Sequence, residues 1–178
     1  MNEEAKAAGN VDSTAAQLEM NCRSIADELE AIVDGCAVRN ASGDIMATAA
    51  IDDFLKNLEG EEKEKFIEWC EENGHIADPA EMNCEDVVAA MVELFDAEEM
   101  TTGDYLDDVL DIVYICDAKK EYRSVRVTVA VGGPNIYVDT DEGAVQGYWG
   151  GSRAEWHFGR DVRDAIDGHF EDLFNCLP

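Results

Sequence analysis

Between residues 122 and 158 the chain reads YRSVRVTVAVGGPNIYVDTDEGAVQGYWGGSRAEWHF. Valine occupies alternate positions from Val125 to Val131, and polar or small residues stand between them. This period of two is typical of a half-buried strand. Glycine-rich and acidic turns then interrupt the stretch three times. The sequence therefore predicts four antiparallel strands joined as a meander, over residues 122–131, 135–139, 144–149 and 153–158.

A helix is expected after the meander, over about 160–174. Its apolar residues recur every three or four positions and should face the sheet; they are Val162, Ile166, Phe170 and Leu173. The same spacing governs the chain before residue 122. The prediction is an α+β fold, with an N-terminal helical region, an antiparallel β-meander and a C-terminal packing helix.

The N-terminal region should contain several helices. The first is expected from about Asp12 or Ser13, with Gly35 as its stop signal. The turn at residues 40–44 leads into a helix that runs to about Leu58. Others are expected at about 61–72, closed by a left-handed cap at Asn73-Gly74, then after Asn83, and from Thr102 or Asp104 to about Val113. Residues 113–116 fit the opening of a strand equally well.

Three regions follow from these patterns. Residues 1–11 are polar and small and are expected to be flexible. Residues 12–121 form an acidic helical region, and residues 122–178 form the antiparallel sheet with its C-terminal helix. Hydrophobic residues make up 46% of the chain, which excludes a purely disordered acidic tail.

Charge is the strongest compositional signal. The 178 residues include 41 Asp and Glu against 13 Lys and Arg, for a net charge of −28. Direct binding to nucleic acid or to an anionic membrane is disfavoured, because the field of the protein repels both. A basic protein partner is favoured instead. The first six residues have neither a basic nor an apolar region of a signal peptide, so we expect a cytoplasmic protein.

The middle third carries most of this charge. Residues 61–121 contain 20 acids and 4 bases, a net charge of −16. Acids three or four positions apart on a helix lie about 5–6 Å apart, so neighbouring acidic elements could approach the charge density of a nucleic acid duplex. The predicted partner-binding residues are Glu61, Glu64, Glu68, Glu93, Asp96, Glu98, Glu99, Asp104, Asp107, Asp108 and Asp111.

Signatures of catalysis and of cofactor binding are missing from the sequence. It contains no P-loop, no dinucleotide-binding glycine pattern, no H-E-x-x-H and no G-x-S-x-G. His157 and His169 are expected to be structural, and we predict neither enzyme activity nor a cofactor. Asp139-x-Asp141-Glu142-Gly143 begins like a calcium loop, but its glycine is one position early and Gly150 stands where a bidentate glutamate belongs. It is predicted to be a hairpin turn, and no metal site is expected.

The six cysteines are scattered singly, without a C-x-x-C pair. In a cytoplasmic chain this spacing favours buried free thiols over disulfides.

The acidic surface has three explanations at this stage: mimicry of nucleic acid, a solvated face without a specific partner, and adaptation to high salt. A small, strongly acidic chain without a catalytic motif resembles the anti-defence proteins of phages and mobile elements. These include antirestriction proteins that mimic DNA and anti-CRISPR proteins that block Cas nucleases. Residues 131–137 through 147–150 also look like a module of small mobile-element proteins.

The resemblance implies an anti-CRISPR protein that acts on a Cas9-type nuclease loaded with guide RNA, in the cytoplasm of a bacterial host cell. Its acids would occupy the basic channel for guide or target nucleic acid. The alternatives are an antirestriction DNA mimic and a non-catalytic acidic module with another basic protein as partner. Mimicry predicts graded losses on single substitution, with only multiple charge reversals, at positions such as Asp104, Asp107, Asp108 and Asp111, being severe.

Overall fold

A computed structural model describes residues 3–177, and the side chains of residues 13–177. The fold is α+β as expected, with N-terminal helices, a five-stranded antiparallel meander and a C-terminal helix packed against it. The chain divides into two compact units. We call the residues up to Glu30 together with those from Thr102 onward the sheet unit, and Ala31–Thr101 the helical unit. These divisions differ from the expected boundaries at residues 12 and 122.

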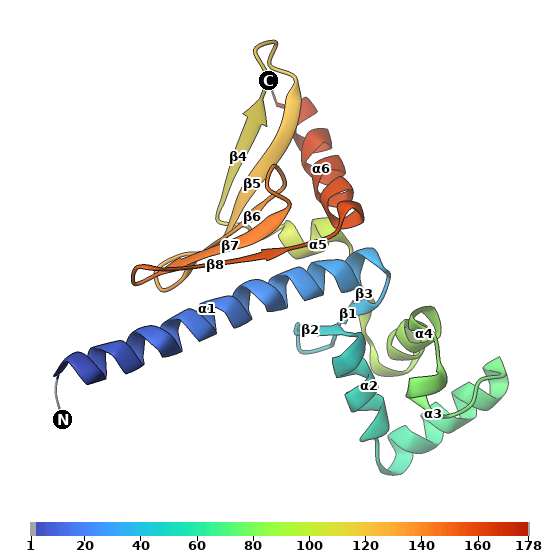
Figure 1. The fold of residues 1–178 in the computed structure, drawn as a ribbon. Coiled ribbons are helices and arrows are strands. Elements are labelled where there is room, and N and C mark those ends of the chain that lie inside the picture. The colour runs from blue at the N-terminus through green and yellow to red at the C-terminus, as the bar shows by residue number, and fades with distance from the viewer. Residues whose placement is uncertain (1–2, 178) are drawn as a thin grey trace. The chain divides into compact units, whose positions relative to one another are not determined.

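The sheet unit is built on an antiparallel sheet whose strands follow their order along the chain (Figure 1). All four strands expected from the period of two are present, and one more precedes them. Helix α5 (Thr102–Leu106) is shorter than expected, because the residues from Asp111 pair with the next strand. The strands are β4 (Asp111–Cys116), β5 (Tyr122–Ala130), β6 (Asn135–Asp139), β7 (Ala144–Trp149) and β8 (Ser152–His157).

One face of this sheet is apolar and is covered by a helix. Strand register places a row of apolar side chains across it: Val127, Val138, Val145 and Trp156. Helix α1 (Glu3–Val33) crosses the same face at Gly147, where an added Cβ would lie 2.6 Å from Cys22 Sγ and 2.7 Å from a methyl carbon of Leu18. Glycine at position 147 therefore allows the helix to approach the backbone of β7.

Helix α6 (Arg160–Asn175) packs against the sheet (Figure 1). Its two ends lie within one residue of the expected bounds. It buries three of the four predicted residues, namely Val162, Ile166 and Phe170. Leu173 is 43% exposed, so its prediction as a sheet-facing residue is wrong. Phe174 replaces it, with its ring centroid 5.3 Å from that of Tyr114 and 5.8 Å from that of Tyr122.

Helix α1 begins earlier than the sequence suggested. It starts at Glu3, where we expected a flexible segment over residues 1–11 and a helix only from Asp12; Met1 and Asn2 lie outside the described residues. Its end agrees with the prediction, because the helix stops at Val33 and Gly35 adopts a left-handed φ of 69°. Leu18, Cys22, Ala26 and Leu29 form its buried stripe within the sheet unit.

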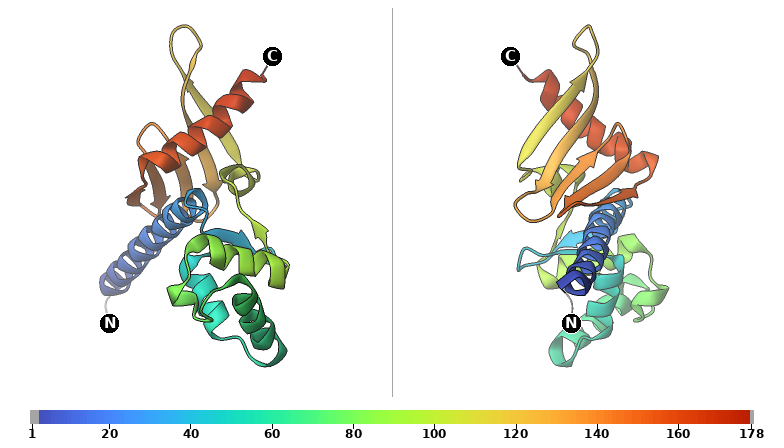
Figure 2. Two further views of the ribbon diagram at one scale, coloured as in Figure 1. Left: turned by 90° about the vertical axis from the view of Figure 1, so that its right-hand side faces the viewer. Right: turned by 60° about the vertical axis from the view of Figure 1, so that its left-hand side comes forward.

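The helical unit gathers three helices around one core (Figure 2). Its elements are β1 (Ala37–Arg39), β2 (Ile45–Ala47), α2 (Thr48–Lys56), α3 (Gly60–Asn73), the 3-10 turn η1 (Pro79–Glu81), α4 (Cys84–Phe95) and β3 (Glu98–Glu99). The small sheet, in the order β2-β1-β3, was not expected. Its strands have two or three residues, which is too few to show a period of two.

Local signals for the helix ends in this unit are confirmed. Gly74 caps α3 in the left-handed region with φ 77°, and the amide of His75 donates to the carbonyl of Cys70 at 2.8 Å. The side chain of Asn83 accepts from the amide of Asp86 at 2.9 Å and so caps α4. Both ends are fixed by residues within one turn, which is why the sequence could predict them.

The expectation of free thiols fails for one pair of cysteines. Cys36, just before β1, forms a disulfide with Cys84, the first residue of α4; their Cα atoms are 5.1 Å apart and 48 positions separate them. Cys22 and Cys70 are buried free thiols, and Cys116 and Cys176 are exposed. The pairing results from the packing of α4 against β1, which the spacing of the cysteines does not reveal.

Candidate partner-binding surface

All eleven predicted partner-binding residues are exposed. They divide between the two units, however, and do not form one helical cluster. Seven belong to the helical unit: Glu61, Glu64, Glu68, Glu93, Asp96, Glu98 and Glu99. Four belong to the sheet unit: Asp104, Asp107, Asp108 and Asp111. The expected acidic helical region over residues 12–121 thus contributes acids to both units, on strands as well as on helices.

The elements that carry these acids also differ from the expected helices. Glu98 and Glu99 form strand β3, where Glu98 stands opposite Arg39 and Glu99 opposite Val38. Asp111 is the first residue of β4 and stands opposite Thr128. Asp96 ends α4 in the left-handed region with φ 53°. A strand places alternate side chains on opposite faces, so neighbouring acids in these segments do not point the same way.

Helix α3 presents the densest row of acids. Its apolar side buries Phe66, Trp69 and Cys70. At 100° per residue, the opposite side of the helix carries five exposed acids: Glu61, Glu64, Glu68, Glu71 and Glu72. Neighbouring carboxylates in this row repel one another, since they recur at three or four positions. We call these five residues the α3 acidic row.

The two ends of α3 place their acids in opposite electrostatic settings. Glu61 and Glu62 stand in the first turn, where the helix dipole favours negative charge. Glu71 and Glu72 stand in the last turn, where the dipole disfavours it, and that turn contains no basic residue. Each such unfavourable placement costs about 0.3–1 kcal/mol at low ionic strength. A cationic partner at this end of the helix would relieve that repulsion.

Glu93 has a structural contact that sequence reasoning missed. Its Oε2 accepts a hydrogen bond from Trp69 Nε1 at 2.7 Å and so joins α4 to α3. Trp69 also stacks on His75 with 5.5 Å between ring centroids, and His75 Nδ1 lies 3.5 Å from Asp86 Oδ2. Glu93 therefore contributes to the packing of the helical unit as well as to its charge.

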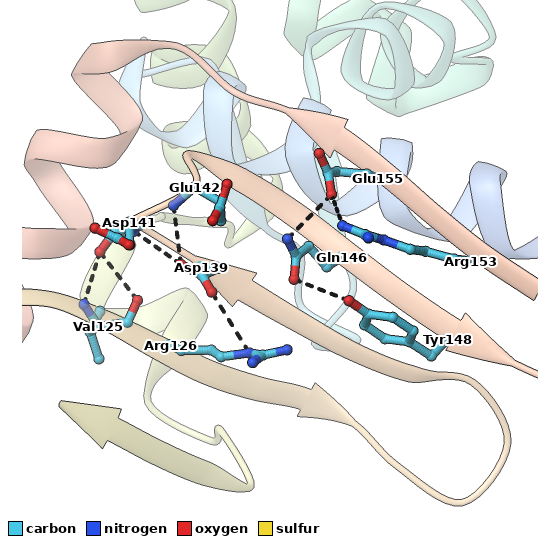
Figure 3. A network of polar contacts seen from close by, with 10 residues as sticks. Val125, Arg126, Asp139, Asp141, Glu142, Gln146, Tyr148, Arg153 and Glu155 are labelled. Atoms are coloured by element: carbon cyan, nitrogen blue, oxygen red, sulfur yellow. Dashed lines mark hydrogen bonds and ion pairs between the residues drawn. The ribbon is translucent and has the colours of Figure 1, made fainter. Parts of the chain in front are cut away.

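The acids of the sheet unit are mixed with arginines. All six arginines in its described part have a carboxylate within 4 Å: Arg23, Arg123, Arg126, Arg153, Arg160 and Arg163. Figure 3 shows part of this network on the sheet, where Arg126 faces Asp139 and Arg153 faces Glu155. Gln146 extends it, because its Nε2 donates to Glu155 at 3.3 Å.

The segment that begins like a calcium loop forms a turn. Asp139 Oδ1 accepts from the amides of Asp141 and Glu142 at 3.0 and 3.2 Å, and its Oδ2 lies 3.8 Å from Arg126 Nε (Figure 3). The carboxylate that would start a calcium loop thus closes the β6–β7 connection. Among the side chains of residues 13–177, no group of three or more His, Cys, Asp or Glu is arranged to hold a metal ion.

The residues considered as candidate bases and nucleophiles differ in their surroundings, and His157 is exposed. His157 Nε2 is 3.2 Å from Glu155 Oε1 on the same strand. His169 packs edge-to-face on Phe170 with 5.0 Å between centroids. Burial raises the pKa of the Cys22 and Cys70 thiols, which lowers the fraction of nucleophilic thiolate.

Comparisons with protein-family models, with curated proteins and with solved structures found no match for this chain. Within residues 3–177, no helix is both long enough and apolar enough to span a bilayer.

Proposed function

We propose that the protein is an anti-defence inhibitor, an anti-CRISPR protein that blocks a Cas9-type nuclease through the acidic surface of the helical unit. The observation that carries the proposal is the charge of this unit. Ala31–Thr101 contains 19 acids and 4 bases, a net charge of −15, and the seven predicted residues within it are all exposed. A surface of this kind fits a groove lined with lysine and arginine.

The charge density along α3 alone is too low to imitate a duplex, and Lys63 and Lys65 lower it further, so mimicry depends on the acids of the whole helical unit. Helix α3 has 14 residues and five acids in its acidic row, which is roughly one charge per 4 Å of helix axis at 1.5 Å per residue. Duplex DNA carries about one per 1.7 Å. The exposed acids of β3 and of the end of α4 add to the same unit, so its total charge approaches that of a short duplex.

Inhibition under this proposal needs no chemistry by the inhibitor. The carboxylates take the place of phosphates in the basic channel of the nuclease and compete with guide or target nucleic acid. Long-range attraction accelerates the encounter at low salt, and screening weakens it at high salt. The complex should be stoichiometric, and the protein alone should bind neither DNA nor RNA.

A cleavage assay tests the proposal. The protein is titrated against guide-loaded Cas9 at low and physiological salt, with a restriction enzyme in parallel. Inhibition of Cas9 alone near one-to-one stoichiometry supports it. Equal inhibition of both enzymes would indicate a broad DNA mimic of the antirestriction kind. Inhibition of neither would refute the Cas9 assignment and leave an acidic module with another basic partner.

Order of addition tests the competitive mechanism separately. A mimic should lose potency when target DNA is bound to Cas9 before the inhibitor is added, because the channel is already filled. Unchanged potency in that order would contradict competition with target DNA and would indicate a complex that holds both inhibitor and nucleic acid.

A further inference from the structure

A groove with both apolar and polar residues in its lining opens on the surface of the strongly acidic helical unit. It has a volume of about 430 Å³ and lies between the β1–β2 turn, α2 and α4. Its apolar lining consists of Met46, Phe54, Met91, Leu94 and Phe95. Met91 is buried and closes the floor. A volume of this size, within the range of about 300–1,000 Å³ for binding pockets, is sufficient for a large side chain from another molecule.

We propose that this groove receives a large apolar side chain from a basic segment of the partner protein. The inference rests on the proposed function in one respect, namely that the partner is basic. It adds the site at which an uncharged anchor of that partner is buried.

The wall of the groove is formed by two aromatic rings. Phe54 on α2 and Phe95 on α4 meet edge-to-face, with 5.1 Å between ring centroids and 88° between planes. Phe54 remains 36% exposed, although it belongs to an amphipathic helix whose residues Ile51 and Leu55 are buried. Its ring thus presents apolar surface to a ligand.

Two methionines make the groove adaptable. Met46 on β2 and Met91 on α4 contribute thioether side chains to its lining. Such side chains are unbranched and polarizable, and they adjust to the shape of an inserted group. The groove therefore fits Leu, Met, Phe or Trp from a partner and does not require one particular side chain.

Acids at the rim determine the charge of the segment that carries the anchor. Glu62 in the first turn of α3 and Asp96 at the end of α4 both line the groove and are exposed. The surrounding unit has a net charge of −15. An acidic segment would be repelled here, whereas lysines or arginines beside the apolar anchor would meet these carboxylates.

An anchor of this kind changes how the complex responds to salt. Charge pairs at a rim mainly increase the rate of association and are screened, while a buried apolar side chain contributes affinity that salt does not remove. Burial of one leucine-sized side chain should strengthen binding by about tenfold or more.

Two synthetic peptides test the groove on the full chain. One, of about 14 residues, has lysines and leucines at helical spacing, and the other has serine in place of every leucine. Binding is measured by calorimetry at about 0.1 and 0.5 M NaCl. We expect the leucine peptide to bind at least about tenfold more tightly, and the difference to persist at the higher salt. Equal affinities would overturn the proposal.

Variants locate the apolar contribution. Ala41→Phe adds a ring at the exposed rim of the groove without removing a buried atom, and Phe54→Ser removes part of the wall. Both should abolish the preference for the leucine peptide. Ile67→Ser is the matched control, because Ile67 is 37% exposed on α3 and does not line the groove. Circular dichroism of each variant verifies that it is folded. Loss of the preference in the control, or its persistence in Ala41→Phe, would contradict the proposed site.

This test and the cleavage assay can fail independently. If the protein discriminates between the peptides but does not inhibit Cas9, the proposed binding site in the groove is supported and the proposal that Cas9 is the partner is refuted. If the protein inhibits Cas9 but does not discriminate between the peptides, the groove is refuted as a binding site, and the proposal of inhibition through the acidic surface remains. Glu62→Gln with Asp96→Asn should weaken both peptides equally, since asparagine also tolerates the left-handed φ at position 96. A change of the leucine preference in this variant would contradict the division between charged rim and apolar anchor.

Discussion

The two units of the molecule are almost equally acidic, yet they distribute their charge differently. The sheet unit has 22 acids and 9 bases, a net charge of −13, and the helical unit has 19 acids and 4 bases, a net charge of −15. In the sheet unit each described arginine lies beside a carboxylate, and Figure 3 shows this for Arg126 and Arg153. These pairs involve a minority of its 22 acids, so the unit keeps a net charge of −13. In the helical unit only 4 bases accompany 19 acids, so a smaller share of its acids can be paired with a base.

The units also differ in what stabilises them. The helical unit has a disulfide across a 48-residue separation, and the sheet unit depends on the close approach of α1 to β7 at Gly147. Tryptophans report on each unit separately, because Trp69 belongs to the helical unit while Trp149 and Trp156 belong to the sheet unit.

Removal of the disulfide should have the largest effect. Cys36→Ser with Cys84→Ser should lower the free energy of unfolding of the helical unit by about 2–4 kcal/mol, because the unfolded chain regains the entropy of a long open loop. Denaturation followed by Trp69 fluorescence, in a background with Trp149→Phe and Trp156→Phe, measures it. Cys116→Ser with Cys176→Ser, which replaces exposed free thiols, is the control and should change little. Equal loss in both double variants would contradict a specific role for the bond.

The sheet unit should be sensitive at Gly147. Gly147→Val would press against Leu18 and Cys22 of α1, and we expect a loss of about 3 kcal/mol in the stability of that unit. Unfolding followed by the fluorescence of Trp149 and Trp156, with Trp69→Phe as background, measures it. Gly168→Ala is the matched control, because an added Cβ there meets no atom within 4 Å and alanine favours the helix. A neutral Gly147→Val would show that α1 does not pack on β7 in solution.

Charge reversal compares the units as partner-binding surfaces. The triple change Glu64→Lys, Glu68→Lys and Glu71→Lys in the helical unit should weaken Cas9 inhibition by about 100-fold, which corresponds to 2.7 kcal/mol. Lysine at Asp104, Asp107 and Asp108 of the sheet unit makes the same change in net charge, and the sequence alone predicted a severe loss there. Because the proposed interface lies on the helical unit, we now expect this triple to weaken inhibition by less than about fivefold. Equal losses would mean that total charge decides binding, and a larger loss in the second triple would assign the interface to the sheet unit.

Much of the fold was predictable because its signals are local. The bounds of β6 and β7 agree with their period of two and their glycine turns, and the caps at Gly74 and Asn83 lie within one turn of the helices they end. The features that the sequence did not predict depend on contacts between segments that are distant in the chain. Strand β3 pairs with β1 about 60 positions away, and Cys36 meets Cys84 only after α4 has packed.

For the candidate site, the sequence predicted that the acidic residues are exposed but did not predict how they are arranged. A high density of Asp and Glu predicts exposure, and all eleven residues are exposed. Their division between two units could not be predicted, because it depends on the packing of α5 against α6, which lies far along the chain. The hydrogen bond from Trp69 to Glu93 was also missed, because the two residues lie on different helices and 24 positions apart in the sequence.

The smallest effect concerns the two ends of α3. Glu71→Gln with Glu72→Gln should raise the stability of the helical unit by about 0.5–1 kcal/mol at low salt, because it removes negative charge from the last turn and repulsion from Glu68. Glu61→Gln with Glu62→Gln should lower it by a similar amount, since the first turn favours acids. Chemical denaturation with urea at about 10 and 500 mM NaCl measures the change in the free energy of unfolding of each variant. Both changes should be smaller at the higher salt. Changes of the same sign would mean that total charge, and not the helix dipole, governs this helix. If the expected signs are found, Glu71 and Glu72 lower the stability of the helical unit. Loss of the proposed Cas9 inhibition in Glu71→Gln with Glu72→Gln would then indicate that these two acids serve partner binding.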